Sequence, residues 1–428
     1  MLQGISRRLF CSSLMAASTA AVPGGSWLHN LAAAGKSDTA KVQRVILLWL
    51  HGGPATIDLW DVKTDHENGG PSREIATKTP GLKFSDHFSR LANWSENCAV
   101  IRSMTTREGD HGRAVHLART GYVPQAGIDF PDLGALVAHE RFVPDAALPG
   151  FVSIAPPQRP AIANSGFLGN AAAPLVVGEM AKSIDDLTVR DLEPFAAWRT
   201  DDQRRRVDLL QEMNQEFLGG KPATKATEIG SATQRALRMM HPDVLAAFDL
   251  NQETGSTRDR YGRTVFGQGC LLARRLAERD VPFIEVSLGG WDTHSDNFNR
   301  VGSLARQVDD GFASLMQDLH DRGMLDSTLI LCQGEFGRTP KINANTGRDH
   351  WPRAWAVMMA GGPNCRGQIV GSTSRDGTTV ETQPHSVPNL IATVCANLGI
   401  DPMKQNASNV NRPIRVADPD AQVIEELV

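Results

Sequence analysis

The sequence predicts a doubly wound α/β domain, a mostly parallel central sheet with helices on both sides. Two observations predict this fold class. Short continuous apolar runs alternate along the chain with helical stretches, and side chains that commonly bind metals follow several of the apolar runs. Ligands of open α/β sheets bind beyond the carboxyl ends of the strands. We therefore expect a functional site at that edge of the sheet.

The first predicted strand is Val45–Leu50, a continuous apolar run typical of a strand that is buried on both faces. It leads into His51-Gly52-Gly53-Pro54, so His51 lies at a carboxyl end. Residues 99–101 predict a second, short strand. A polar loop at 103–112 follows it, and then a helix over 113–120.

The middle of the chain is less regular. Residues 183–219 are charged and predict a helical region, and residues 220–231 are rich in small side chains and predict an exposed linker. A helix over 266–279 and a strand over 281–288 follow, and the strand leads to Gly290-Trp291-Asp292-Thr293-His294. We expect residues 183–231 to be peripheral.

Alternation continues to the carboxyl terminus. Apolar residues step by three and four from Val301 to Leu319, which predicts an amphipathic helix that ends at a C-cap glycine, Gly323. A strand over 328–332 leads to Gly334-Glu335-Phe336-Gly337-Arg338. Further elements are a strand over 355–360 and a helix over 387–398.

Composition excludes some classes of function. Charged residues make up 21% of the 428 residues and the net charge is -4, so no large basic field is available and we expect no nucleic-acid partner. Five cysteines after residue 35 show no CxxC spacing. We interpret Cys332 and Cys395 as small buried apolar residues, and no dense disulfide framework is expected.

The amino terminus predicts export. Ser6-Arg7-Arg8-Leu9-Phe10 matches the twin-arginine pattern, residues 14–22 are apolar, and Ala32-Ala33-Ala34 offers a cleavage site before Gly35. We expect a Tat signal peptide at 1–34 that is recognised by the Tat translocase, a single domain at 35–428, and a periplasmic or otherwise exported protein. The alternative is a disordered basic segment. No transmembrane segment is expected in the mature chain.

Carboxylate and imidazole side chains near the predicted strand ends predict an N/O site for a divalent metal ion. The alternative is that they are loop caps and surface groups. Oxygen ligands suit Ca²⁺ or Mg²⁺ and three imidazoles favour Zn²⁺, so the ion stays open between Zn, Ca and Mg. The candidate ligands are His51, Asp292, His294, Glu335, Asp349 and His350.

The chain resembles a known superfamily. Residues 307–337 are similar to the late helix–strand segment of sulfatases and other alkaline-phosphatase-superfamily enzymes, and the whole mature chain resembles an uncharacterised family of Tat-exported bacterial proteins distantly related to sulfatases. The motifs that carry this resemblance are His51-Gly52-Gly53-Pro54, Asp292-Thr293-His294, Gly334–Pro340 and Gly347–Pro352. It implies an alkaline-phosphatase-like three-layer fold and a metal-dependent hydrolase of phosphate or sulfate esters.

Residue by residue, the resemblance implies a modified metal set. Asp292 and His294 match the Asp–His pair of the superfamily, and Glu335 matches the acid after the following strand. His350 matches the last histidine, with Asp349 as a ligand or as an acceptor that orients an imidazole. Two positions depart from the pattern: His51 replaces the first metal acid, and Phe336 replaces a His or Asn. These departures imply that the site binds fewer metal ions than the sites of the superfamily, down to one ion.

The nucleophile is the position at which the resemblance is weakest. A sulfatase carries Cys-x-Pro-x-Arg where this chain has Gly109–Arg113, and no cysteine is present there. Cys98 lies on the predicted strand and lacks the proline. His111 could attack phosphorus or sulfur, act as a general base, or bind the metal. The hydroxyls of Ser103, Thr105 and Thr106 are weaker candidates, because such loop residues commonly cap or turn the chain.

Arginines complete the predicted site. Arg113, at the arginine position of the sulfatase motif, is a candidate for holding an anionic ester, such as a sulfated or phosphorylated glycan, and so are Arg338 and Arg348. Arg338 and Arg348 could instead pair with carboxylates of the site. Asp58 is a further candidate that could also bond its own backbone. The functional alternative to a hydrolase is an inactive metal-containing binding or assembly protein of the cell envelope, and a third possibility is a site without an ion.

Overall fold

The computed structural model describes residues 42–143, 146–157, 164–189, 239–240 and 242–428, together with residues 205–206, 208–210, 212–213 and 216. The expected signal peptide and the expected linker at 220–231 lie outside these residues, as does most of the expected helical region at 190–219. Within the part described, no helix combines the length and the apolar character needed to cross a bilayer.

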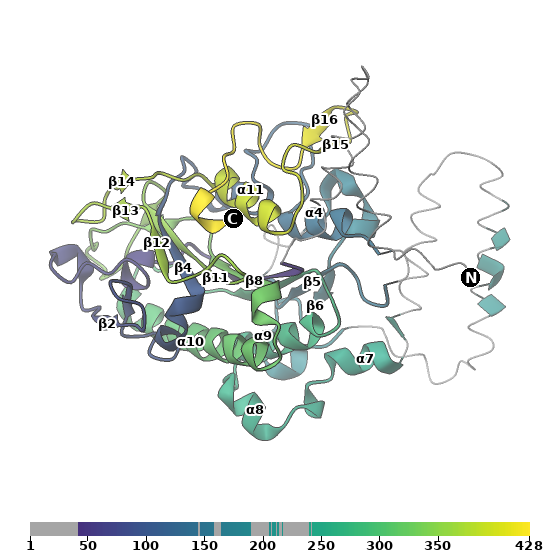
Figure 1. The fold of residues 1–428 in the computed structure, drawn as a ribbon, viewed down its shortest axis with the longest axis horizontal. Coiled ribbons are helices and arrows are strands. Elements are labelled where there is room, and N and C mark those ends of the chain that lie inside the picture. Colours follow the sequence, from purple (N-terminus) through teal and green to yellow (C-terminus); the bar gives the residue numbers. More distant parts are fainter. Residues whose placement is uncertain are drawn as a thin grey trace, which may run out of the picture. The chain divides into compact units, whose positions relative to one another are not determined.

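An eight-stranded sheet forms the centre of the described part (Figure 1), in the order β12-β4-β11-β8-β1-β7-β5-β6. β11 is antiparallel to both of its neighbours, and every other neighbouring pair is parallel. The predicted mostly parallel sheet is therefore confirmed. Its strands are β1 (Arg44–Leu50), β4 (Cys98–Met104), β5 (Phe151–Ile154), β6 (Leu175–Val177), β7 (Phe283–Leu288), β8 (Thr328–Gln333), β11 (Trp355–Gly361) and β12 (Gln368–Val370).

Helices cover both faces of this sheet, with α9 and α10 on one side and α4 and α11 on the other (Figure 1). The predicted three-layer arrangement is thus confirmed. The described α-helices are α3 (His111–Thr120), α4 (Leu133–Glu140), α7 (Pro242–Phe248), α8 (Gly255–Arg260), α9 (Val265–Ala277), α10 (Asn297–Asp321) and α11 (Val387–Asn397).

The first strand shows why its sequence is apolar throughout. Ile46 and Leu48 point into the core that includes α9 and α10, whereas Leu47 and Trp49 point into the core that includes α3, α4 and α11. All seven residues of β1 are buried. Alternate side chains of a strand point to opposite faces, so a central strand between two helical layers needs apolar residues at both.

The segment between β4 and α3 differs from the prediction. β4 extends to Met104, so Ser103 is a fully buried strand residue and not part of a loop. α3 begins at His111, two residues earlier than expected, because the Asp110 side chain accepts a hydrogen bond from the Arg113 backbone N–H at 3.1 Å and caps the helix. His111 therefore lies at the start of a helix.

The structure confirms the predicted C-cap glycine of α10 and the predicted burial of Cys332 and Cys395. The predicted start of the helical region at residue 183 is wrong. Gly323 has φ +66° just beyond α10, as a C-cap glycine requires. The cysteines of the described chain are free and buried. The expected helical region does not begin at residue 183, because residues 183–189 contain only the 3₁₀ turn Ile184–Asp186, whereas the described residues between 205 and 216 are helical as expected.

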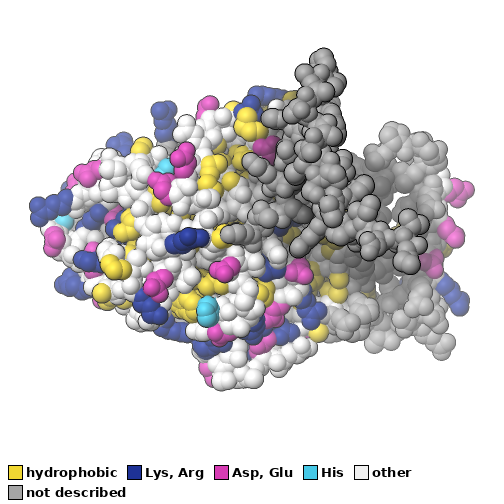
Figure 2. Space-filling view, viewed as in Figure 1, with side chains coloured by type: hydrophobic (Ala, Val, Ile, Leu, Met, Phe, Trp, Pro, Cys, Tyr) yellow, Lys and Arg dark blue, Asp and Glu magenta, His cyan; other side chains and the backbone are white. Residues whose placement is uncertain are grey.

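Among the described residues, four small antiparallel sheets lie outside the central sheet, and one of them, β9 with β10, positions the site described below. On the face shown in Figure 2, charged side chains of both signs are interspersed, in keeping with the small net charge. The short strands are β2 (Glu74–Ala76), β3 (Lys83–Ser85), β9 (Gly337–Arg338), β10 (His350–Trp351), β13 (Ser372–Thr373), β14 (Val380–Thr382), β15 (Gln405–Ala407) and β16 (Pro413–Arg415).

Candidate metal centre

The carboxyl ends of three neighbouring parallel strands carry several of the predicted site residues. β8, β1 and β7 lie side by side in the sheet. Glu335 follows β8, His51 follows β1, and Asp292 and His294 follow β7. Because parallel strands end at the same edge, residues from three distant parts of the sequence meet there.

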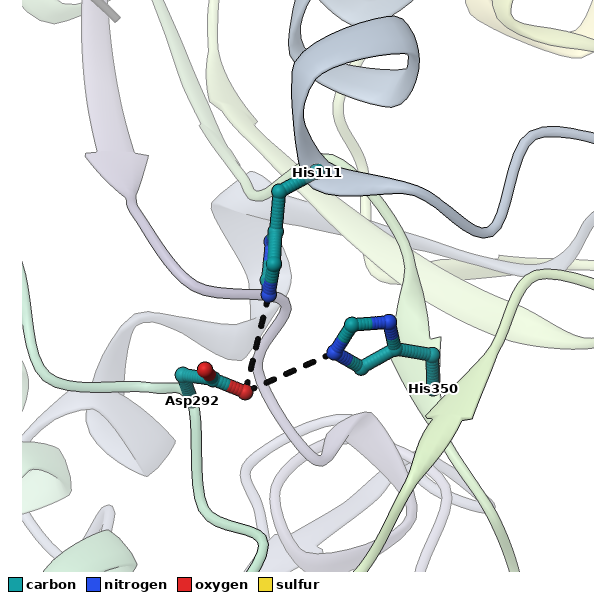
Figure 3. Close-up of side chains that lie close together, drawn as sticks. All are labelled: His111, Asp292 and His350. Atoms are coloured by element: carbon teal, nitrogen blue, oxygen red, sulfur yellow. Dashed lines mark ion pairs between the residues drawn. The ribbon is translucent and has the colours of Figure 1, made fainter. Parts of the chain in front are cut away.

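Two further histidines reach the same place by other routes. His350 begins β10, which pairs with β9 so that His350 lies opposite Arg338. His111 is the first residue of α3. Figure 3 shows the rings of His111 and His350 directed from a helix and a strand toward Asp292, which lies on the loop after β7.

The Oδ1 atom of Asp292 is the centre of this constellation. It lies 3.1 Å from His294 Nε2 and 3.5 Å from the Nε2 atoms of both His111 and His350. The ligand atoms of His111, Asp292 and His350 all lie within 4.8 Å of one another. We call His111, Asp292, His294 and His350 the four-residue cluster.

Each histidine of the cluster is held through its other ring nitrogen. His111 Nδ1 lies 2.7 Å from Glu335 Oε1, and His294 Nδ1 lies 2.7 Å from Asp349 Oδ1. His350 Nδ1 donates to the Gly109 carbonyl at 2.8 Å. Carboxylate and carbonyl oxygens accept hydrogen bonds, so each Nδ1 carries the proton and each Nε2 of a neutral ring offers its lone pair. Histidines that bind metals show this arrangement.

The distance between His294 and His350 can be compared with the spacing of ligand atoms around a metal ion. Their Nε2 atoms are 3.1 Å apart. Two neutral rings held in this way would direct lone pairs at each other, which is unfavourable unless a proton or a metal ion lies between them. Ligand atoms around a tetrahedral Zn²⁺ are about 3.4 Å apart, from bonds of 2.0–2.2 Å. The separations from Asp292 Oδ1 and between His294 and His350, 3.1–3.5 Å, agree with this spacing. His294 is outside the group formed by His111, Asp292 and His350, whose ligand atoms all lie within 4.8 Å of one another.

The electrostatics of the cluster lower the pKa of His350 and raise that of His111. Burial, more than any other cause, lowers the pKa of His350, which disfavours its charged form. Burial would raise the pKa of Asp292, but the hydrogen bond and charge of Arg338 outweigh this effect and lower it. Asp292 is therefore an anion that faces imidazole lone pairs. The hydrogen bond with Glu335 raises the pKa of His111.

Glu335 is buried behind His111 and does not face the centre of the cluster. Its two carboxylate oxygens accept hydrogen bonds from Gly52 N at 3.1 and 3.2 Å, and Oε1 also contacts His111 Nδ1. Asp349 likewise contacts His294 by its Oδ1. The structure therefore places two of the three predicted metal acids, Glu335 and Asp349, where they orient His111 and His294.

His51 lies beside the cluster without joining it. Its Nδ1 is buried and has no hydrogen-bond partner among the described residues. Burial lowers the pKa of His51, and the charges of Glu335 and His111 act on it in opposite directions. The sequence-predicted first ligand thus faces the same region but is outside the group of converging donor atoms.

The arginines form part of the framework of the site. Arg338 is buried, and its guanidinium donates to the carbonyls of Gly52, Gly53 and Arg348 and to Asp292 Oδ1 at 2.5 Å. Arg348 is also buried and pairs with Asp58. Arg113 is half-exposed, and two of its nitrogens donate to Glu108. Arg338 and Arg348 thus take the carboxylate-pairing alternative left open by the sequence.

Phe336 closes the cluster on its buried side. Its ring is fully buried, with its centroid 5.0 Å from that of His111 and 4.7 Å from that of His350. A ring in this place offers no metal ligand. The phenylalanine identified from the sequence as a departure therefore lies where it separates the cluster from the protein interior.

Sequence reasoning missed the backbone acceptor of His350, the Gly109 carbonyl. It also missed Thr293 and Asn297, which are buried and bonded to each other between the cluster and Asp58. No spacing rule identifies a carbonyl acceptor. For Thr293, the only signal was its place between two predicted ligands.

Comparison with solved structures finds distant likenesses. Ps i-CgsB in complex with k-i-k-neocarrahexaose is 12% identical with a TM-score of 0.42, covering 84% of this chain and 72% of that one. A protein in the alkaline phosphatase superfamily from Vibrio parahaemolyticus is 10% identical with a TM-score of 0.40, covering 85% and 68%. PsFucS1 sulfatase from Pseudoalteromonas sp. is 13% identical with a TM-score of 0.36, covering 87% and 70%.

These likenesses assign no activity to the chain. A search of curated proteins finds no match. The model of one family, DUF1501, described as "Protein of unknown function", matches residues 42–428. The expected membership of an uncharacterised family is confirmed: the chain belongs to the DUF1501 family.

Proposed function

We propose that this protein is a metal-dependent hydrolase of phosphate or sulfate esters that uses one divalent ion. The observation that carries the proposal is the convergence of three imidazole Nε2 atoms on Asp292 Oδ1, with every Nδ1 held by an acceptor. Three nitrogens and one carboxylate oxygen favour Zn²⁺ over Ca²⁺ or Mg²⁺. Phe336 supports a single ion, because it replaces a ligand on the buried side.

When bound, the ion would neutralise charge on the ester oxygens. The protein would supply orientation. Glu335, fixed by Gly52, holds His111 with its Nε2 toward Asp292, so this imidazole can bind the ion or accept a proton from attacking water. Asp292 and His294 are about half-exposed, which leaves the cluster accessible to an anionic ester such as a sulfated or phosphorylated glycan.

Hydrolysis of aryl phosphate and aryl sulfate, with and without Zn²⁺, tests this proposal. We expect zinc-dependent turnover of one of the two esters, lowered at least 100-fold by His294→Ala. His320→Ala is a matched control, because His320 is also an exposed histidine beside an aspartate but lies at the other end of α10. Absence of metal-dependent turnover on both esters would count against the hydrolase.

A second candidate function is a metal-containing binding or assembly protein of the envelope without turnover. The arginines favour it: Arg338 and Arg348 donate to protein groups, and no cysteine stands at the sulfatase position near His111. Stoichiometric metal combined with inactivity on both esters, and retention of a sulfated or phosphorylated glycan, would support this candidate.

We also propose export by the Tat translocase to the periplasm or beyond, supported by Ser6-Arg7-Arg8-Leu9-Phe10 and the alanines before Gly35. Replacement of both arginines by lysine should leave the protein in the cytoplasm with its leader uncleaved. Unchanged export of that variant would contradict this route.

A further inference from the structure

Two of the three segments that carry the four-residue cluster are joined by a buried polar network. Its members are Asp58, Thr293, Asn297 and Arg348, which we call the Asp58 network. Each of their side chains is at most 1% exposed. Asp58 follows β1, Thr293 lies between Asp292 and His294, and Arg348 precedes Asp349 and His350. The network therefore reaches both ligand-bearing loops from a third segment.

Asp58 is the centre of this network. Arg348 donates to both of its oxygens, from Nε to Oδ2 and from Nη2 to Oδ1, each at 2.8 Å. Asn297 Nδ2 donates to Oδ2, also at 2.8 Å. A bidentate pair of this kind fixes the orientation of both partners. Because both are buried, loss of either charge would leave the other unpaired away from water.

The bonds continue to the two ligand loops. Thr293 Oγ1 donates to Asn297 Oδ1 at 2.7 Å, so the residue between Asp292 and His294 is tied to Asp58 through Asn297. The Arg348 backbone N–H donates to the Thr293 carbonyl at 3.0 Å, which joins the two loops directly. Arg348 also donates to the carbonyls of Thr339, Pro340 and Asn68.

Asp58 itself does not reach the cluster. Among the described residues, its carboxylate accepts hydrogen bonds from Arg348, Asn297 and Ser72. Its carboxylate makes no hydrogen bond or ion pair with the four converging side chains in the described part of the chain, so we expect it to act on the ion through the loops that it holds.

We propose that Asp58 is a positioning residue that sets the separation of His294 and His350, and thereby the affinity of the cluster for Zn²⁺. This inference rests on the proposed metal-binding function. Residues that orient metal ligands typically change metal affinity 10- to 100-fold when they are replaced. A merely structural carboxylate would change stability and leave the affinity of the folded protein for zinc unaltered.

The test compares Asp58→Asn with Asp318→Asn in the full-length chain. Asp318 is 2% exposed and pairs with Arg260, Arg274 and Tyr261, but it lies about 30 Å along α10 from Asn297. Zn²⁺ affinity of the chelator-stripped proteins is measured against a chromophoric indicator, and stability is measured by urea unfolding without metal. We expect both variants to lose stability, and only Asp58→Asn to bind zinc about 10- to 100-fold more weakly.

Thr293→Val is the second variant, because it removes one hydroxyl and retains the shape and the charges of the network. We expect it to fold and to bind zinc about tenfold more weakly. If the wild type binds zinc, and Thr293→Val and Asp58→Asn bind it equally well, this inference is overturned and the proposed function is not. If Asp58→Asn does not fold, the zinc affinity of Thr293→Val alone decides the test. A wild-type protein that binds no zinc would instead overturn the proposed function, and this inference with it.

Discussion

At the scale of single residues, the candidate centre depends on which nitrogen of each imidazole carries its proton. His111, His294 and His350 use three different acceptors, a glutamate, an aspartate and a backbone carbonyl, and all three present Nε2 to Asp292. The sequence alone could not predict these ring orientations. It left three roles open for His111: nucleophile, general base and metal ligand. The acceptors decide the direction of each ring.

Sequence reasoning identified Asp292, His294 and His350 from strand ends, and these three residues do lie together. It placed Glu335 and His51 among the ligands as well, by their position after β8 and β1. Position after a strand specifies the edge of the sheet but does not specify the side-chain rotamer. The Glu335 side chain is directed toward Gly52 and His111, and the sequence pattern does not specify this orientation.

A histidine outside the centre yields a prediction on pH. Burial lowers the pKa of His385 below its ordinary 6.5, and neither ring nitrogen has a hydrogen-bond partner in the described part of the chain. Below pH 6.5 the unfolded chain binds a proton at this residue that the native state resists, so stability should fall as the pH drops through 6.5.

The check is urea unfolding of the wild type and of His385→Gln at pH 7.5 and 5.5 in the presence of chelator. The wild type should lose more free energy of unfolding over this interval than the variant. His320→Gln, at an exposed position, should behave like the wild type. An equal loss in the wild type and His385→Gln would refute the assignment.

At the scale of elements, the turn after β1 passes close to the backbone of the loop that carries Asp292. Gly52 has φ +117°, and a Cβ there would lie 2.6 Å from the backbone nitrogen of Asp292. Gly52→Ala should therefore strain the turn and displace Asp292. We expect a cost of about 1–3 kcal/mol from the backbone conformation, a further loss from the clash, and zinc affinity lowered at least about tenfold.

Gly81→Ala is the matched control for this prediction. Gly81 has φ +84°, and a Cβ there would meet nothing within 4 Å. It should cost about 1–2 kcal/mol and leave zinc affinity unchanged. Chemical denaturation and zinc titration of both variants measure the two effects. Equal losses of stability and affinity in the two variants would show that the approach to Asp292 has no role.

Long, strongly patterned elements could be predicted from the sequence, and short ones could not. β1, β8 and α10 have continuous apolar runs or a clear period of three and four residues, and they form as expected. β5 and β6 have only four and three residues, too few to show a period, and their place in the sheet depends on pairing with β7. The antiparallel direction of β11 likewise follows from tertiary pairing.

At the scale of the whole molecule, the fold explains why residues so far apart in sequence can form one centre. β8, β1 and β7 are adjacent in the sheet, although β1 begins near residue 44 and β8 near residue 328. Helical layers bury both faces of the sheet and leave its carboxyl edge to carry polar groups. The Asp58 network and Arg338 then tie the loops at that edge together.

The central claim is that this edge binds one cation through the four-residue cluster. Zinc titration of the chelator-stripped wild-type protein, with elemental analysis of the product, tests it most directly. We expect one equivalent of Zn²⁺ per chain, and affinity lowered at least 100-fold in His294→Ala and in His350→Ala but not in His320→Ala. A wild-type chain that takes up no stoichiometric zinc, or equal affinity in all three variants, would contradict the account.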